Sequence, residues 1–153
     1  MANETTKKPW LRRLLISLLI LVLIGAGIYW WVATDQFSDT KDRKAAYTLP
    51  AAQFLKEFQD SLAVANTRYT DQIVAISGRV SEVEAADTTI NIKFVDPATS
   101  SYLIFAFQQQ HLAEAKSVKV GDSLTVKGSC SGGIFSELLE VTSVSFKRSA
   151  LVK

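Results

Sequence analysis

The sequence predicts a mainly β domain, a five-stranded barrel with a leading helix and a short helix between strands three and four, behind one transmembrane helix. Three observations predict it: an uncharged apolar run near the start, a helical apolar stripe after residue 47, and short alternating stretches from residue 72 onward. The chain has 153 residues, which leaves room for one domain of moderate size beyond the apolar run.

The apolar run covers residues 14–32 and contains no charged side chain. At about 1.5 Å per residue it spans roughly 28 Å, close to the hydrocarbon thickness of a bilayer. A cleaved signal peptide is the alternative, but the run is longer than the apolar part of a signal and lacks a small-residue cleavage site. We therefore predict an uncleaved anchor over residues 14–33, with a basic cytoplasmic tail over residues 1–13.

The flanks of the run indicate its orientation. Arg12 and Arg13 directly precede it, and positive charge next to a span favours the cytoplasmic side, so the C-terminal part should lie outside the cytoplasm. Aromatic residues typical of the headgroup region stand at both ends: Trp10, Tyr29, Trp30 and Trp31. The lipid bilayer is accordingly the first expected partner of the chain.

Residues 34–46 are short, polar and charged, which is typical of a linker. The part of the chain after residue 33 holds 13 basic and 14 acidic residues, a net charge of −1. The basic balance of the whole chain therefore comes from the N-terminal segment and does not indicate nucleic-acid binding by the domain that follows.

The domain is expected over residues 47–153 and should begin with a helix. Thr48 is a plausible N-cap, Pro50 suits the first turn, and Asn66 is a plausible end. The apolar residues between them recur at helical spacing: Phe54, Leu55, Phe58 and Leu62. A stripe of this kind most often packs onto a neighbouring sheet, and a partner-binding helix is the alternative.

Strands should follow at "QIVAISGRVSEVE", "TTINIKF", "SYLIFAF", "SLTVKGS" and within "GIFSELLEVTSVSF". Gly78 in the first of them suggests the bend by which a strand curls into a barrel. "QQQHLAEAKSV" lacks a β pattern and predicts the short helix, and "SCSGG" reads as the exit from the fourth strand. Five strands with a helix between the third and fourth are the arrangement of an OB-fold barrel.

The sequence also resembles the bacterial tRNA-anticodon-like OB-fold family, small exported or membrane-anchored domains. The resemblance covers residues 47–146 and rests on an Asn shortly before a Tyr, a "V-x-V-x-G-x-V"-type strand, and "G-D-x-V-x-V-x-G-x-C-x-G". The matching residues are Asn66, Tyr69, Val74, Ile76, Gly78, Val80, Gly121, Asp122, Leu124, Val126, Gly128, Cys130 and Gly132. It implies a single-pass protein of the bacterial inner membrane with a periplasmic or extracellular domain.

The same resemblance implies a second cysteine near the last strand, which this chain lacks, since Cys130 is its one cysteine. A disulfide within the monomer is therefore excluded, and Cys130 is expected to be a small residue at a strand end. His111 is the one histidine, so a Cys/His pair would need a chance meeting. We expect no enzyme activity, no metal site and no cofactor.

A ligand-binding face would need aromatic rings beside basic residues. The candidate rings lie in "SYLIFAF" and the candidate cations on neighbouring strands: Tyr102, Phe105, Phe107, Lys93, Arg79 and Lys127. The net charge argues against nucleic acid as the partner. The sequence thus predicts a membrane-anchored interaction module with a protein partner at the membrane, and single-stranded nucleic acid or oligosaccharide binding by this face is the alternative.

Overall fold

The computed structural model describes residues 9–36 and 39–152. They fall into two compact units divided after Ser38, each described here by itself. The basic tail up to Lys8 and residues 37–38 of the predicted linker lie outside the described residues.

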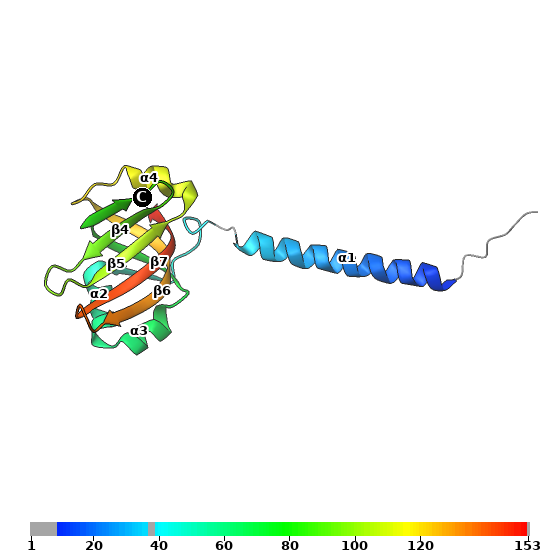
Figure 1. Cartoon of the computed structure of the whole chain (residues 1–153), viewed down its shortest axis with the longest axis horizontal. Coiled ribbons are helices and arrows are strands. Elements are labelled where there is room, and N and C mark those ends of the chain that lie inside the picture. The colour runs from blue at the N-terminus through cyan, green and yellow to red at the C-terminus, as the bar shows by residue number, and fades with distance from the viewer. Residues whose placement is uncertain (1–8, 37–38, 153) are drawn as a thin grey trace, which may run out of the picture. The chain divides into compact units, whose positions relative to one another are not determined.

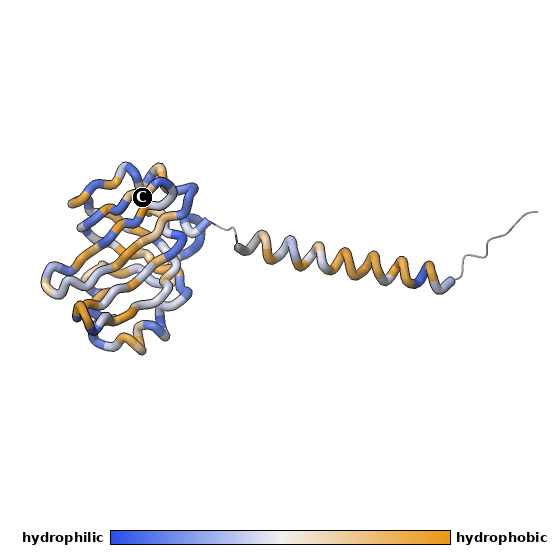
Figure 2. The backbone as a smooth tube through the Cα atoms, in the orientation of Figure 1, coloured by the Kyte–Doolittle hydropathy of each residue, from blue (hydrophilic) through white to orange (hydrophobic). Residues whose placement is uncertain are grey.

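The first unit contains α1 (Pro9–Gln36), a helix of 28 residues. Its stretch Pro9–Ala33 is long and apolar enough to cross a membrane, a property that a signal sequence near the N-terminus shares. Figure 2 shows the hydrophobic character of most of this helix. The aromatic residues predicted for its two ends are exposed: Trp10, Tyr29, Trp30 and Trp31.

The second unit is built on one sheet, drawn in Figure 1. Its strands in the described residues are β1 (Tyr47–Pro50), β2 (Ile73–Arg79), β3 (Glu82–Ala85), β4 (Ile90–Val95), β5 (Tyr102–Phe107), β6 (Ser123–Ser136) and β7 (Val141–Val152). They are hydrogen-bonded in the order β1-β2-β6-β7-β5-β4-β3. The helices are α2 (Ala51–Asp60), α3 (Leu62–Tyr69) and, after a 3₁₀ turn at Gln109–His111, α4 (Leu112–Lys116).

The mainly β class, the leading helical region and the short helix after the third predicted strand are confirmed, but the strand count differs from the prediction. The described chain forms a seven-stranded sheet instead of five strands. One added strand is β1, which pairs in parallel with β2 and includes Thr48, so Thr48 is not the predicted N-cap. Pro50 ends β1 and is itself the N-cap of α2, one position before the first turn predicted for it. The other arises because the first predicted strand is interrupted at Val80 and Ser81, two residues after Gly78.

The predicted helix is also two helices, α2 and α3, because Ser61 between them has extended backbone angles. Asn66 lies inside α3, which ends at Tyr69. The buried side of α2 carries Phe54, Leu55 and Phe58, which pack into the same core as the inward residues of the strands. Burying each such side chain contributes about 1.5–3 kcal/mol, so the apolar stripe serves packing.

β6 continues well beyond the strand that the sequence predicts. Its pairing with β7 continues past "SCSGG" to Ser136. The pairing has two irregularities, one between Lys127 and Ser129 and one between Cys130 and Gly132. Gly132 adopts a φ of 98°, which a residue with a Cβ rarely does. The predicted strand exit is therefore wrong, because bulges bend this strand without ending it.

Candidate functional site: the outer face and the hairpin tip

The structure does not bring the six candidate binding residues to one surface. Phe105 and Phe107 point into the core, with exposed fractions of 0% and 8%, so their rings cannot stack on a ligand. Lys127 donates hydrogen bonds to the carbonyl oxygens of Lys41 and Arg43 and serves structure. Arg79 lies elsewhere, at the end of β2, which leaves Lys93 and Tyr102 together.

Lys93 and Tyr102 belong to a surface that we call the outer face: the outward side of β4, β5, β7 and the end of β6. Alternation along β5 places Tyr102 and Ile104 opposite the buried Leu103 and Phe105. Strand register then aligns Tyr102 with Ser143, and Ser143 with Ile134 of β6. A row of partly exposed apolar and small polar side chains therefore crosses the sheet.

Two lysines stand on the described outer face, Lys93 of β4 and Lys147 of β7, and both pair with carboxylates, Lys147 with Asp71 at 3.2 Å. Lys93 pairs with Glu82 at 3.3 Å and with Glu84, and its ammonium lies 5.7 Å from the centre of the Tyr102 ring. The hydrogen bond with Glu84 is the main reason that the pKa of Lys93 is raised, and Lys93 in turn lowers the pKa of Glu84. A phosphate at this site would have to displace two carboxylates.

At its β6 side the outer face continues into the hairpin tip, residues 134–140, which joins β6 to β7 (Figure 1). Its large apolar side chains are exposed: Ile134 68%, Phe135 52%, Leu138 92% and Leu139 68%. Scattered exposed apolar residues are ordinary, but four within seven residues make a patch of the kind that marks interaction surfaces. Glu137 and Glu140 flank the two leucines and give the tip a negative rim.

A second concave region lies between α2 and the ends of β2, β4 and β5, which we call the groove. It has a volume of about 800 Å³, with Leu55, Phe94 and Leu103 among its apolar lining residues. Arg79, Val120 and Gly121 line it on the other side.

The remaining reactive side chains serve structure. Cys130 is fully buried within β6, and burial raises the pKa of its thiol to about 11, far from that of a nucleophilic thiolate. His111 is 6% exposed and not solvated. Among the described residues, no three His, Cys, Asp or Glu side chains are grouped to hold a metal ion.

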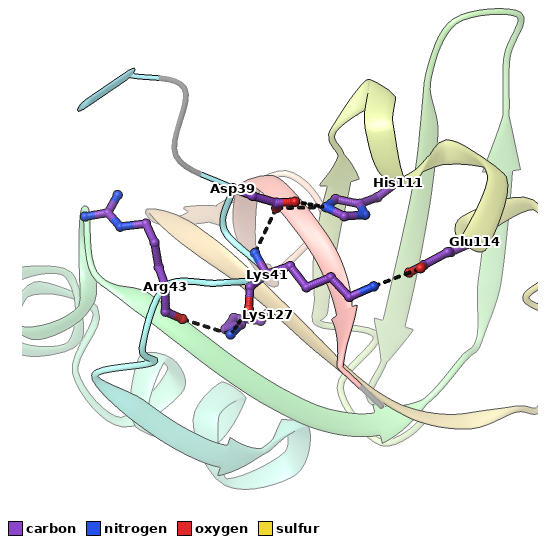
Figure 3. A network of polar contacts seen from close by, with 6 residues as sticks. All are labelled: Asp39, Lys41, Arg43, His111, Glu114 and Lys127. Carbon is purple, nitrogen blue, oxygen red and sulfur yellow. Dashed lines mark hydrogen bonds and ion pairs between the residues drawn. The ribbon is translucent and has the colours of Figure 1, made fainter. Parts of the chain in front are cut away.

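His111 instead fastens the entry segment, residues 39–46, onto the sheet domain (Figure 3). Its Nε2 lies 2.8 Å from Asp39 Oδ1, and Lys41 pairs with Glu114 of α4 at 2.8 Å. Burial alone would raise the pKa of Asp39. Its carboxylate accepts hydrogen bonds from the His111 ring and from the Lys41 backbone N–H, and these bonds lower the pKa below its usual value. Sequence reasoning placed these residues in a linker, because nothing local indicates a partner 72 positions away.

The family pattern matches residues 1–139, most of the chain. The chain belongs to the tRNA_anti-like family. No curated protein sequence matches it. Among solved structures, a Klebsiella pneumoniae lipoprotein, proposed to be nucleic acid-binding, aligns at 18% identity over 69% of this chain and 91% of its own, with a TM-score of 0.55.

Two aspartyl-tRNA synthetases align more loosely. The Leishmania major protein is 12% identical over 76% of this chain and 22% of its own, with a TM-score of 0.45. The Entamoeba histolytica protein is 10% identical over 72% of this chain and 26% of its own, with a TM-score of 0.43. The alignment with the Klebsiella pneumoniae lipoprotein supports the fold, and neither it nor the family match supports the sequence-based expectation that nucleic acid is an unlikely partner.

The residues that carry the tRNA_anti-like resemblance prove to be structural. The Asn66 side chain accepts a hydrogen bond from Gly133 N at 2.7 Å and donates one to Gly133 O at 2.9 Å. A Cβ on Gly132 would lie 2.9 Å from Asn66 Oδ1, so α3 approaches β6 closely there. This latch between Asn66 and the glycines holds the helix to the sheet. For Asn66 and Gly132, the resemblance therefore reports a contact that holds the fold together.

Proposed function

We propose that this protein is a membrane-anchored OB-fold module that binds a protein partner through the hairpin tip and the adjoining outer face. The observation that carries the proposal is the exposed apolar cluster of the tip, next to a face whose two described lysines, Lys93 and Lys147, are paired with carboxylates. Apolar contact surrounded by a polar rim is typical of protein interfaces.

We further propose that the sheet closes into a five-stranded OB barrel. β2 and β3 are separated by two residues and pair with different neighbours, β6 and β4. Together they correspond to one long first strand that bends at Val80 and Ser81 and pairs with β6 before the bend and with β4 after it. Val80 N bonds to Asp122 O, and Ser81 N bonds to Lys93 O, so the bend is hydrogen-bonded toward both neighbours.

The anchor belongs to the same proposal. α1 has the length of a membrane span and carries Arg12 and Arg13 near its start, which favours a cytoplasmic N-terminus and a periplasmic or extracellular domain in a bacterial inner membrane. A tethered domain meets membrane partners at high effective concentration, so a modest interface suffices.

We propose binding without catalysis. The two side chains that a nucleophilic mechanism would use have other roles: the Cys130 thiol is buried, and His111 is paired with Asp39.

Nucleic-acid binding is the second candidate, favoured by the description of the Klebsiella pneumoniae lipoprotein. Two features of this chain count against it. Counterion-release affinity needs several clustered cations, whereas Lys93 on the outer face is already paired. Base stacking needs exposed rings, and of the three predicted rings only Tyr102 lies on that face.

Photocrosslinking of the full chain in its native membrane tests the proposal. A benzophenone amino acid placed at Leu138 should give one discrete protein adduct, whereas the same group at Val64 of α3, which is also exposed, should not. Equal labelling at both positions would overturn the assignment of the tip. Crosslinks to RNA or DNA that disappear steeply with salt would establish the second candidate instead.

A further inference from the structure

The groove is separate from the hairpin tip, because none of its lining residues lies within residues 134–140. Gly78, which lines the groove, pairs with Leu124 at the start of β6, whereas the tip begins at Ile134 near its end. At about 3.3 Å per residue, the ten positions from Leu124 to Ile134 correspond to a path of roughly 33 Å along the bent strand. A ligand confined to the groove would leave the exposed side chains of the tip uncovered.

The groove has the dimensions and lining of a small-molecule site. Its volume of about 800 Å³ lies inside the range of roughly 300–1,000 Å³ that such sites occupy. Its accessible apolar lining comes from Pro50, Ala52 and the 65% exposed Val120. Buried side chains close its floor: Leu55, Phe94 and Leu103. An apolar body with one polar end matches this distribution.

Arg79 lies at the rim of the groove, and its positive charge has no partner carboxylate among the described residues. Its Nε donates to the carbonyl of Gly121 at 3.1 Å, which fixes the guanidinium beside the turn and leaves its terminal nitrogens for another acceptor. Gly121 has a φ of 96°, so the turn that presents this carbonyl depends on a glycine. Among the described residues, no carboxylate forms an ion pair with Arg79.

The other charged rim residues already have partners. Lys56 faces Asp60 one helical turn later, at 3.7 Å. Asp96 accepts hydrogen bonds from Ala98 N and Thr99 Oγ1 with its two carboxylate oxygens. The rim therefore offers one uncompensated positive charge, and that charge belongs to a guanidinium, whose planar fork matches a carboxylate with two parallel hydrogen bonds.

We propose that the groove binds a single-chain amphiphile that ends in a carboxylate, a medium-chain fatty acid. The hydrocarbon chain lies against Pro50, Ala52 and Val120, and the carboxylate pairs with Arg79. A single negative charge matches the single free cation, whereas a phosphate monoester carries about −1.5 to −2 and would call for a second one.

Photolabelling of the full chain, reconstituted in phosphatidylcholine nanodiscs, tests this assignment. The probe is dodecanoic acid with a diazirine in its chain, and labelled peptides are located by mass spectrometry. We expect label on α2 and on the turn around Val120, removed by excess dodecanoate but not by dodecyltrimethylammonium, which has the same chain and the opposite charge. Label on α1 reports partition into the bilayer and is scored separately.

Two variants separate the charge from the cavity. Arg79→Gln should reduce labelling of α2 about tenfold, as expected for loss of a charge-assisted pair. Ala52→Trp, at an exposed lining position of α2, should abolish the labelling by filling the groove. Arg43→Gln removes an exposed arginine away from the groove and should change nothing. Labelling that survives Arg79→Gln, or that the cationic amphiphile removes equally well, overturns the proposal.

Discussion

From Val126 to Gly133, β6 packs against α3 and the core, and Val126, Cys130 and Gly133 are buried. From Ile134 to Ser136 and around the following turn, the same chain carries its large apolar side chains into solvent. Both stretches are rich in small and apolar residues, but only in the first are the apolar side chains covered by other parts of the described chain. The family resemblance, through Gly128, Cys130 and Gly132, comes from the buried stretch, so it identifies the fold while the binding proposal rests on the exposed one.

Replacing Phe58 should produce the largest loss, because it is the aromatic contact of α2 with the buried stretch. Phe58→Ala should lower the free energy of unfolding by about 3–5 kcal/mol, measured by urea unfolding of the full chain in non-ionic detergent. A Cβ at Gly133 would lie 2.5 Å from the Phe58 ring.

Gly133→Ala should therefore cost about 1–3 kcal/mol in the wild-type background and clearly less beside Phe58→Ala, where the cavity accepts the methyl group. Additive losses would show that the two residues do not share this contact.

The Asn66 latch should give the next largest effect. Asn66→Ala leaves the N–H and C=O of the buried Gly133 without their side-chain partner and should cost about 1–3 kcal/mol. Thr67→Ala on the exposed side of the same helix is the matched control and should stay within about 0.5 kcal/mol. Similar losses for both would mean that the helix itself, and not the latch, is affected.

The entry segment should make a smaller, pH-dependent contribution to the free energy of unfolding. Because the folded state lowers the pKa of Asp39, its contribution is complete above the unfolded pKa and disappears as pH falls through the folded one. Asp39→Asn should cost about 1 kcal/mol near neutral pH, and the two proteins should converge in acid. A stability difference that stays constant down to low pH would remove the titration of Asp39 as its cause.

The hairpin tip should give the smallest effect on stability. Leu138→Ser with Leu139→Ser removes two exposed side chains, so the free energy of unfolding should change by no more than about 0.5 kcal/mol. The same variant, with the benzophenone amino acid placed at Phe135 instead of position 138, should lose the crosslink to a partner. A decrease of about 2 kcal/mol or more in the free energy of unfolding would show that the tip packs as part of the core, and the two stretches of β6 would then not differ as described.

The sequence predicted the elements whose signal is local. The helical spacing of Phe54, Leu55 and Phe58 and the alternation of Ile90, Ile92 and Phe94 both gave the buried side correctly. It misplaced Phe105 and Phe107, because a strand that is apolar on both faces does not reveal which face is covered. It also missed the exposed tip, since "IFSELLE" has the same composition whether it is buried or not.

By itself, the sequence determined the apolar helix, the mainly β class and the family, since hydrophobic periodicity and glycine positions are properties of short segments. The tertiary structure decided which residues meet: Asp39 with His111, Asn66 with Gly133, and Arg79 with Gly121. These contacts join residues 42 to 72 positions apart, and such distances are set by sheet register and helix packing, which no local pattern encodes. The groove and the tip follow from the same register, because it fixes which apolar side chains are left uncovered.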